Sequence, residues 1–332
     1  MLAELDAALA RRRADGLMRE RRVVETAQGP RIRVGGRELL AFASNDYLGL
    51  ASAPEVVDAL CGAARDYGAG AGASHLVVGH QRPHETLEHE LAQFVVPCAN
   101  ARAIVLSSGY LANLAILTAL AGRDDAIFAD RLNHACLTDG ALLSRARLTR
   151  YPHVDVAALR AALAGAKARR RFIVTDAVFS MDGDVAPLGE LLALAEAHDA
   201  WLVVDDAHGF GVQGAGRGSL AQAGLASERI VYMGTLGKAA GVAGAFVAAH
   251  PLVIETLVQS ARPYVYTTAA PAALAAALSA ALRCIRDGAR RRAHLGALIA
   301  AFRAGAEGLP WRLLASSTPI QPLVLGDVAS AL

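Results

Sequence analysis

Short apolar runs alternate with longer segments of helical spacing through the middle of the chain. Each run ends in small or polar residues, and each longer segment places apolar residues three and four positions apart. This alternation predicts an α/β fold in which the strands pair mostly in parallel and helices cover both faces of the sheet. The predicted strands are 101–109, 126–130, 172–180, 201–209 and 229–235, and the predicted helices are 110–122, 155–168 and 187–199.

The two ends of the chain differ in texture from this middle part. Both ends are rich in arginine and have the spacing of amphipathic helices. We therefore expect residues 1–40 and 283–332 to contribute to a smaller α+β domain, with residues 41–282 forming the large domain. The uncharged, alanine-rich stretch 267–282 is short for a membrane span and contains Pro271, so it predicts a helix of a globular domain.

Charge and cysteine content narrow the class of protein. The 332 residues include 33 Lys or Arg and 31 Asp or Glu, a balance that argues against nucleic acid or a membrane as the main partner. The four cysteines lie far apart, which argues against a disulfide framework or a zinc site and favours a reducing compartment. The first residues carry charges throughout and show no signal peptide. We therefore expect a cytoplasmic protein without a bound metal.

The chemically unusual residues of the chain follow the predicted strands. In parallel sheets, ligands bind beyond the carboxyl ends of the strands. The segments at these ends are SSGY (107–110), DAVFSMDGD (176–184), DDAHG (205–209) and GTLGK (234–238). The fold would bring these segments together, so we expect the functional site there.

Lys238 is the one charged residue in GTLGKAAGVAGAF (234–246), which otherwise contains Gly, Ala, Thr and apolar residues. One interpretation is that the lysine simply extends from a loop into solvent. The other is that it loses hydration, which lowers its pKa and gives a nucleophilic amine that can react with carbonyl compounds or pyridoxal phosphate. The small neighbours would then let the backbone pass close to a bound ring.

Asp205 is the first of two adjacent acids that end an apolar strand in VVDDAHG (203–209). Taken alone, this motif fits a solvated loop with a capping carboxylate as well as it fits a ligand site. A pyridoxal-phosphate site, however, needs an acid for the ring nitrogen, a cradle for the phosphate and a lysine. Asp205 supplies the acid, and the start of the helix near residue 110 supplies backbone N–H groups. His208 could face the same ligand.

Three further motifs have ordinary structural interpretations beside their functional ones. GFGVQG (209–214) has the dinucleotide-binding pattern but is followed by an apparent loop instead of a helix. GAGAGAS (68–74) fits a flexible loop beside a ligand better than a phosphate-binding loop. HQRPHETLEH (80–89) has metal-like histidine spacing, but Pro83 favours a helix N-terminus with capping and packing histidines.

Six motifs in order along the chain resemble the α-oxoamine synthases. These are fold-type I pyridoxal-phosphate enzymes that condense an amino acid with an acyl thioester. The resemblance runs from about residue 4 to the chain end and implies a seven-stranded, mostly parallel sheet flanked by helices, with a smaller α+β domain. The motifs are SNDYLGL (44–50), SSGYLAN (107–113), DRLNHACLTDG (130–140), FSMDGDVAPL (179–188), DDAHGFGVQGAGRG (205–218) and TLGKAAGVAGA (235–245).

The resemblance also implies roles for individual residues. Lys238 would form the Schiff base with pyridoxal phosphate, Asp205 would pair with the pyridine nitrogen, and His134 would stack on the ring. His208, the fourth implied catalytic residue, would lie with Ser180 beside the phenolic oxygen. The implied phosphate contacts are Gly109, Tyr110 and Thr235, with Thr267 or Thr268 reaching across a homodimer. The implied substrate contacts are Asn45, His134 and either Arg19 or Arg21.

Within this family, the motifs best match the enzyme that condenses L-alanine with a pimeloyl thioester, carried by coenzyme A or a carrier protein. Other α-oxoamine synthase activities, a non-catalytic homologue and a nicotinamide dehydrogenase stay open as alternatives. Family members also continue for several tens of residues beyond the position of Leu332. That part completes the small domain and supplies an arginine for the substrate carboxylate, so we expect the segment 283–332 to be only the start of its domain.

Overall fold

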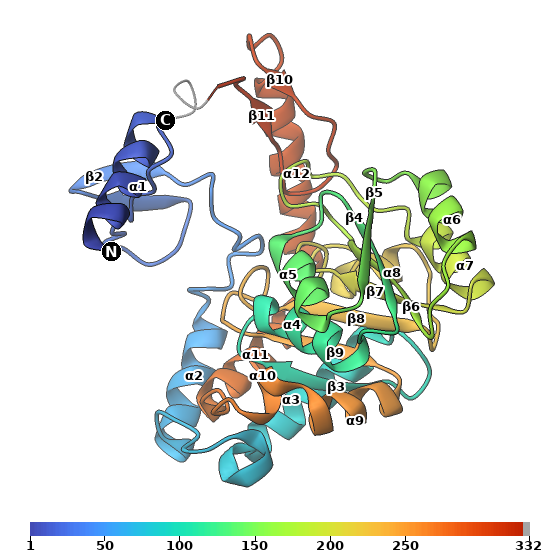
Figure 1. The fold of residues 1–332 in the computed structure, drawn as a ribbon. Helices are drawn as coiled ribbons and strands as arrows, with labels where there is room; N and C mark the ends of the chain where they lie inside the picture. The colour runs from blue at the N-terminus through green and yellow to red at the C-terminus, as the bar shows by residue number, and fades with distance from the viewer. Residues whose placement is uncertain (328–332) are drawn as a thin grey trace.

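The computed structural model describes residues 1–327, and its centre is a seven-stranded sheet (Figure 1). The strand order is β3-β9-β8-β7-β6-β4-β5, and only β9 runs antiparallel to its neighbours. The predicted α/β fold with a mostly parallel sheet is therefore confirmed. The strands are β3 (Arg102–Leu106), β4 (Ala126–Asp130), β5 (Arg147–Tyr151), β6 (Arg171–Asp176), β7 (Ala200–Asp205), β8 (Ile230–Thr235) and β9 (Ala245–Ala249).

Helices cover both faces of the sheet, because alternate residues of each buried strand point to opposite sides. One face packs against α4 (Gly109–Leu120), α5 (Ala135–Ser144), α9 (Pro251–Ser260) and α10 (Arg262–Val265). The other face packs against α2 (Pro54–Tyr67), α3 (Arg82–Val95), α6 (Val156–Ala164), α7 (Leu188–Ala197) and α11 (Ala272–Arg286).

The predicted elements lie where expected, with shorter ends. The strand predicted over 101–109 ends at Leu106, and the helix predicted over 155–168 ends at Ala164. Asp155 caps that helix, because its Oδ1 accepts a hydrogen bond from the N–H of Ala158 at 2.8 Å. The sequence pattern also gave no prediction for several elements of this domain, among them β5, β9, α5 and α9. The strand β5 lies at the sheet edge and has the polar sequence RLTRY, which gives no apolar run to detect.

The chain ends form two small units beside the sheet (Figure 1). The N-terminal unit contains α1 (Leu2–Ala14) and a hairpin of β1 (Arg31–Val34) and β2 (Arg37–Leu40), and α1 buries none of its residues. The C-terminal unit contains α12 (Ala289–Gly305) and the two-residue strands β10 (Arg312–Leu313) and β11 (Leu323–Val324). The domain boundaries near residues 40 and 283 stay predictions. Within residues 1–327, no helix has the length and apolar character needed to cross a membrane.

Candidate active site

Three neighbouring parallel strands bring the predicted site residues to one edge of the sheet. The register pairs Asp176 at the end of β6 with Asp205 at the end of β7, and Asp205 with Met233 of β8. Lys238 follows β8 by three residues. The carboxyl ends of these strands therefore place two buried aspartates and a lysine in one cluster, as the strand-end argument predicts.

Lys238 is held beside a neutral histidine. Its Nζ lies 2.8 Å from His208 Nε2, and His208 Nδ1 lies 2.7 Å from the hydroxyl of Tyr47. Burial lowers the pKa of Lys238, although the carboxylates of Asp205 and Asp176 oppose this shift. Burial, followed by the positive charge of Lys238, lowers the pKa of His208 to about 3. His208 is thus neutral at physiological pH, and its Nε2 can accept a hydrogen bond from the Lys238 amine.

Asp205 is almost completely buried and holds two hydrogen bonds. Its Oδ2 accepts from Asn113 Nδ2 at 2.7 Å, and its Oδ1 accepts from the N–H of Ala207 at 2.9 Å. Burial raises its pKa, while Lys238 and the two donors act in the opposite direction. A buried carboxylate with spare lone pairs favours a cationic or N–H partner on its open side.

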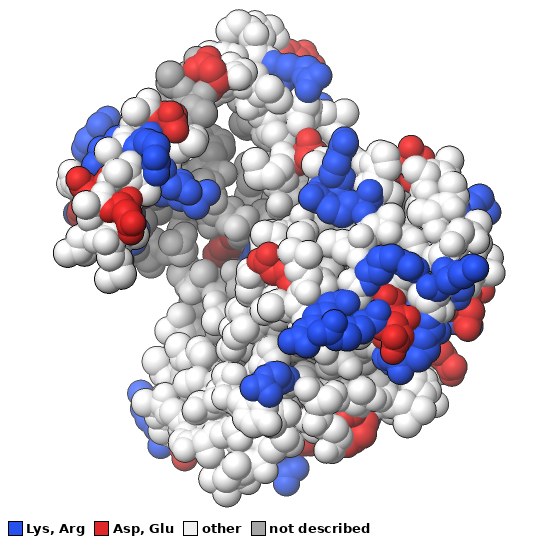
Figure 2. All heavy atoms as spheres, viewed as in Figure 1, with Lys and Arg blue, Asp and Glu red and all other residues white. Residues whose placement is uncertain are grey.

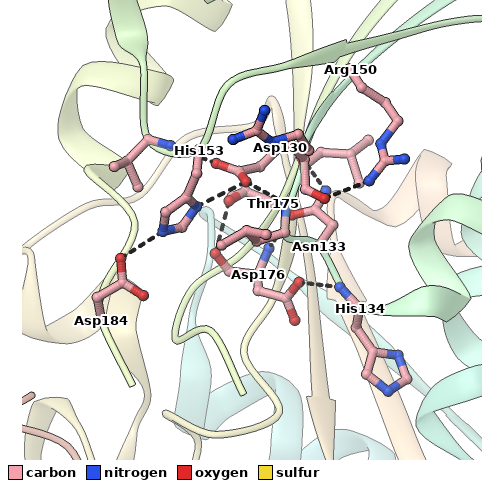
Figure 3. Close-up of polar contacts among 12 residues, drawn as sticks. Asp130, Asn133, His134, Arg150, His153, Thr175, Asp176 and Asp184 are labelled. Atoms are coloured by element: carbon pink, nitrogen blue, oxygen red, sulfur yellow. Dashed lines mark hydrogen bonds and ion pairs between the residues drawn. The ribbon is translucent and has the colours of Figure 1, made fainter. Parts of the chain in front are cut away.

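His134 lies at the start of α5, on the Asp205 side of the sheet. Its N–H donates to Asp176 Oδ2 at 2.7 Å, as Figure 3 shows, while its Nδ1 lies 2.9 Å from Cys136 Sγ and accepts from the N–H of Cys136. These contacts fix the backbone of His134 and leave its side chain exposed. An imidazole presented in this way can cover the face of a ligand.

The N-terminus of α4 lies next to the end of β8. Ser108 caps this twelve-residue helix, with its Oγ accepting from the N–H of Leu111 at 3.2 Å. A methyl group added at Gly109 would lie 3.8 Å from Thr235 Oγ1, so the first N–H groups of α4 and this hydroxyl are close neighbours. Such a helix start favours the binding of a phosphate. The side chain of Tyr110 points elsewhere and donates to Asp139 Oδ2.

The other predicted residues lie around this cluster or apart from it. Ser180 is half-buried in the turn after β6, and exposed Asn45 accepts a hydrogen bond from Tyr47 at 3.1 Å. Thr267 and Thr268 line a small pocket with His75 and Ser107 of the same chain. Arg19 and Arg21 are exposed on the N-terminal unit, and the structure does not bring them to the cluster.

Four contributors to the site were given no role in the sequence analysis: Tyr47, Asn113, Cys136 and Asp176. Asn113 carried a signal, because it is a polar residue inside an otherwise apolar helical segment. Asp176 ends a buried strand in the same way as Asp205 and could have been found by that comparison. Tyr47 and Cys136 lie within the motifs SNDYLGL and DRLNHACLTDG, but the motifs alone assign neither residue a role.

The motif GFGVQG, which has the dinucleotide-binding pattern, has a structural role. A side chain at Gly209 would overlap Asp206 and Ser219, and one at Gly211 would approach Ala239 Cβ at 2.7 Å, so the glycines of GFGVQG serve close packing. The segment predicted to be a loop after this motif includes a four-residue helix, α8 (Ser219–Gln222), which is too short for a dinucleotide-binding helix.

HQRPHETLEH contains the start of α3, as predicted. His84 Nδ1 accepts a hydrogen bond from the N–H of Gln81 at 3.0 Å, and its Nε2 lies 2.8 Å from the carbonyl oxygen of Ala270. His80 instead turns toward Glu85 and Glu88, and the ligand atoms of these three residues lie within 4.8 Å of one another. His80 Nε2 forms a hydrogen bond with Glu85 at 3.1 Å.

Comparisons with known proteins agree with the fold. The family model for aminotransferase class I and II matches residues 37–332. An 8-amino-7-oxononanoate synthase from Aromatoleum aromaticum is 59% identical over 333 residues, which cover 100% of this chain and 86% of the relative.

Two solved structures extend this agreement to three dimensions. A variant of serine palmitoyltransferase from S. paucimobilis with bound PLP–myriocin aldimine superimposes with a TM-score of 0.91 at 29% identity, covering 98% of this chain and 86% of the other. An 8-amino-7-oxononanoate synthase from Francisella tularensis superimposes with a TM-score of 0.75 at 33% identity, covering 86% and 81%. The chain therefore belongs to the class I and II aminotransferase family of fold-type I pyridoxal-phosphate enzymes, in its group of 8-amino-7-oxononanoate synthases.

Proposed function

We propose that the protein condenses L-alanine with a pimeloyl thioester and releases carbon dioxide and the free thiol, giving 8-amino-7-oxononanoate for biotin synthesis. The observation that carries this proposal is the 59% identity to an 8-amino-7-oxononanoate synthase over the whole chain. The serine palmitoyltransferase from S. paucimobilis has the same fold, but its sequence identity to this chain is 29%, about half as high. This difference favours the alanine and pimeloyl reaction over the sister activities.

The donor set at the strand ends fits pyridoxal phosphate. Asp205 offers a buried carboxylate for a protonated ring nitrogen, and Lys238 offers an amine with a lowered pKa for the aldehyde. The N-terminus of α4 at Gly109 and Tyr110, with Thr235 beside it, offers donors for the phosphate. When bound, the cofactor supplies an electron sink for a carbanion at the amino-acid Cα.

Lys238 is also the candidate base at the substrate Cα. Its lowered pKa increases the share of neutral amine, and His208 at 2.8 Å holds the lysine nitrogen in place. In the neutral form whose Nε2 faces Lys238, His208 Nδ1 donates to the Tyr47 hydroxyl oxygen, which fixes the imidazole. We assign proton removal and return to Lys238 Nζ, and the positioning of that atom to His208 and Tyr47.

The remaining predicted residues have supporting roles in this proposal. His134 would cover one face of the bound cofactor ring, and Ser180 and His208 would hold the side of its phenolic oxygen. Asn45 borders the amino-acid substrate, and Arg19 or Arg21 contacts the acyl substrate once the N-terminal unit lies over the site. Their charge suits the phosphates of coenzyme A or of a carrier-protein arm.

We further propose a homodimer in the cytoplasm. The π-helical turn His75–Gly79 exposes Leu76, Val77 and Val78, with Val77 at 72% and Val78 at 75% exposure. In the view of Figure 2, the lower left part of the surface is mostly uncharged, which suits a surface covered by a second copy. Thr267 and Thr268 of one copy would then reach the phosphate in the other.

Two measurements test the proposal. Borohydride reduction of the purified protein with pyridoxal phosphate should fix the cofactor on the peptide that contains Lys238, and the Lys238→Ala variant should remain unlabelled. Turnover should be found with L-alanine and pimeloyl-CoA, and it should exceed turnover with glycine and acetyl-CoA, glycine and succinyl-CoA, or L-serine and palmitoyl-CoA. A clear preference for glycine or serine would overturn the substrate assignment, whereas failure to label Lys238 would overturn the site assignment.

A further inference from the structure

His153 lies between two carboxylates that belong to different parts of the fold. Its Nδ1 is 3.0 Å from Asp130 Oδ1 at the end of β4, and its Nε2 is 2.8 Å from Asp184 Oδ2 in the turn after β6 (Figure 3). The ring also rests edge-on against Phe179, with centroids 4.4 Å apart. A neutral imidazole has only one N–H, so both contacts are hydrogen bonds only when His153 carries two protons.

The two carboxylates depend on His153 to different degrees. Asp130 also accepts from the N–H of Leu132 and the N–H of Val154, both at 2.8 Å, so it keeps two donors without the histidine. Within residues 1–327, His153 is the one donor to the Asp184 carboxylate, whose Oδ1 is buried without a partner. Loss of one proton from His153 would therefore release the Asp184 side and leave the Asp130 side in place.

Asp184 closes the turn that carries Ser180. The N–H of Phe179 donates to the carbonyl of Asp184 at 3.0 Å, and the N–H of Gly183 donates to the carbonyl of Phe179 at 2.9 Å. Ser316 and Thr318 of the C-terminal unit donate to the carbonyl of Gly183 at 2.7 and 3.1 Å. The turn 179–184 thus connects the strand-end cluster to the segment that follows α12.

Asp130 begins the turn that carries His134. Asn133 donates from its N–H to the carbonyl of Asp130, and its Oδ1 accepts from the N–H of Asp176 at 3.1 Å. Asp176 in turn accepts from the N–H of His134. Figure 3 shows these residues as one connected set that leads from Asp184 through His153 to His134.

We propose that His153 is a positioning residue of the synthase, whose imidazolium fixes the Ser180 turn and the C-terminal segment relative to His134. This inference rests on the proposed roles of Ser180 and His134 in the reaction. His153 touches neither the cofactor site nor the substrate site directly. It acts by holding together two turns that border the site from β4 and β6.

The two carboxylates beside His153 stabilise its protonated form. Burial lowers the pKa of His153, but the hydrogen bonds and charges of Asp130 and Asp184 outweigh burial and raise the pKa above its usual value. Arg150, a nearby cation labelled in Figure 3, donates to the carbonyl of Arg131. Because the pKa in the folded protein is raised, the link is complete at low pH and is lost as pH rises through the raised pKa.

Two variants separate charge from geometry. Asp184→Asn keeps a partner for His153 Nε2, because the amide can donate to a neutral imidazole, and it removes the second carboxylate. His153→Gln breaks the double link. His89→Gln is the matched control, since His89 is an exposed histidine of α3 outside both turns.

NMR titration of histidine Cε1–H signals in the holoenzyme gives the first readout. We expect His153 to titrate above its ordinary pKa in the wild type and to fall by about 1 to 3 pH units in Asp184→Asn, the usual effect of one close opposite charge. A wild-type value at or below the ordinary range would overturn the proposal.

Hydrogen exchange and kinetics give the second readout. The exchange protection factors of the Phe179 and Gly183 amides should fall about tenfold in His153→Gln, and also in the wild type at a pH above the pKa of His153. In Asp184→Asn these amides should remain protected at all pH values. The ratio kcat/KM should fall about tenfold in His153→Gln and lose its alkaline limb in Asp184→Asn. Unchanged protection in His153→Gln would overturn the inference even if the synthase activity is confirmed. The NMR and exchange measurements do not require turnover, so they test His153 even if the proposed activity is not found.

Discussion

Asp205 and Asp206 are adjacent buried carboxylates at the end of β7 that face opposite sides of the sheet. Asp206 belongs to what we term the closed cluster, formed with Ser219 and Tyr232. It accepts from the N–H of Ser219 at 2.6 Å, from Ser219 Oγ at 2.5 Å and from the Tyr232 hydroxyl at 2.9 Å. Burial raises its pKa to about 6, although these donors act against the shift.

Asp205 belongs to the open cluster, formed with Asn113, His134, His208 and Lys238. It has two donors where Asp206 has three, and its neighbours are an amine and imidazoles instead of packed hydroxyls. Burial of a carboxylate therefore does not by itself indicate function. What distinguishes Asp205 is unused hydrogen-bonding capacity beside groups that are able to react.

The largest expected effect is on activity at Asp205. Asp205→Asn should lower kcat about a hundred- to a thousandfold, because an amide cannot stabilise a protonated ring nitrogen as a carboxylate does. Asp206→Asn should keep kcat within about threefold of the wild type per folded molecule, since its contacts lie on the other side of the sheet. Steady-state kinetics and the cofactor absorbance spectrum of both variants check this. Equal losses would show that the two clusters do not differ in function.

The next effect concerns the packing that supports the open cluster. Gly241 has φ of +72°, and a Cβ there would overlap the backbone of Leu50 and Ala51. Gly241→Ala should therefore destabilise the fold by about 2–4 kcal/mol and displace the loop that carries Lys238. Gly237→Ala is the matched control, because the nearest atom to its Cβ would lie 3.9 Å away. The unfolding free energies of both variants in urea test this prediction. A Gly241→Ala protein as stable as the wild type would contradict it.

A smaller effect is expected in the closed cluster. Tyr232→Phe removes one of the three side-chain and backbone donors to Asp206 and leaves the ring in place. We expect a loss of about 1.5–3 kcal/mol in unfolding free energy, the usual range for a hydrogen bond to a charged group, with kcat preserved. Tyr67→Phe at the end of α2 is the control, since Tyr67 is 37% exposed. A loss of activity without a loss of stability would argue that the closed cluster also takes part in the reaction.

The sequence predicted the strand ends and the two reactive residues, because both signals are local. Asp205 and Lys238 each follow an apolar run that lies within ten residues of them. The partners that tune them are not local: Asn113 lies 92 positions from Asp205, and Tyr47 lies 161 positions from His208. No periodicity in a single sequence reports such pairs.

Two other features also depend on residues that are distant in the sequence. The small residues around Lys238 were explained by a passing cofactor ring, whereas Gly241 is required by the backbone at Leu50 and Ala51. The strand β9 has the sequence AFVAA, and its alanines give only a weak strand preference. The tertiary neighbours β3 and β8 decide its conformation and its antiparallel direction.

The smallest effect is on the pH dependence of stability, and there the two clusters should differ in sign. His208 has a pKa of about 3 in the fold, below the unfolded value of about 6.5. The unfolded chain therefore binds the extra proton, and stability is lost as pH falls below 6.5. Asp206 has a folded pKa of about 6, above its unfolded value of about 3.8. The folded chain binds the extra proton in this case, and stability is lost as pH rises from 3.8 to 6.

The measurement is the unfolding free energy of cofactor-free protein in urea between pH 4.5 and 7. Each group contributes at most about 1.4 kcal/mol per pH unit, so removing one should change the slope by about that amount or less. His208→Asn should flatten the rise of stability with pH, because it removes a group that favours the fold only when neutral. Asp206→Asn should steepen that rise, because it removes the opposing group. If the two variants change the slope of stability against pH in the same direction, these assignments are contradicted. The assignments are a neutral His208 in the open cluster and an Asp206 that binds a proton near pH 6 in the closed cluster.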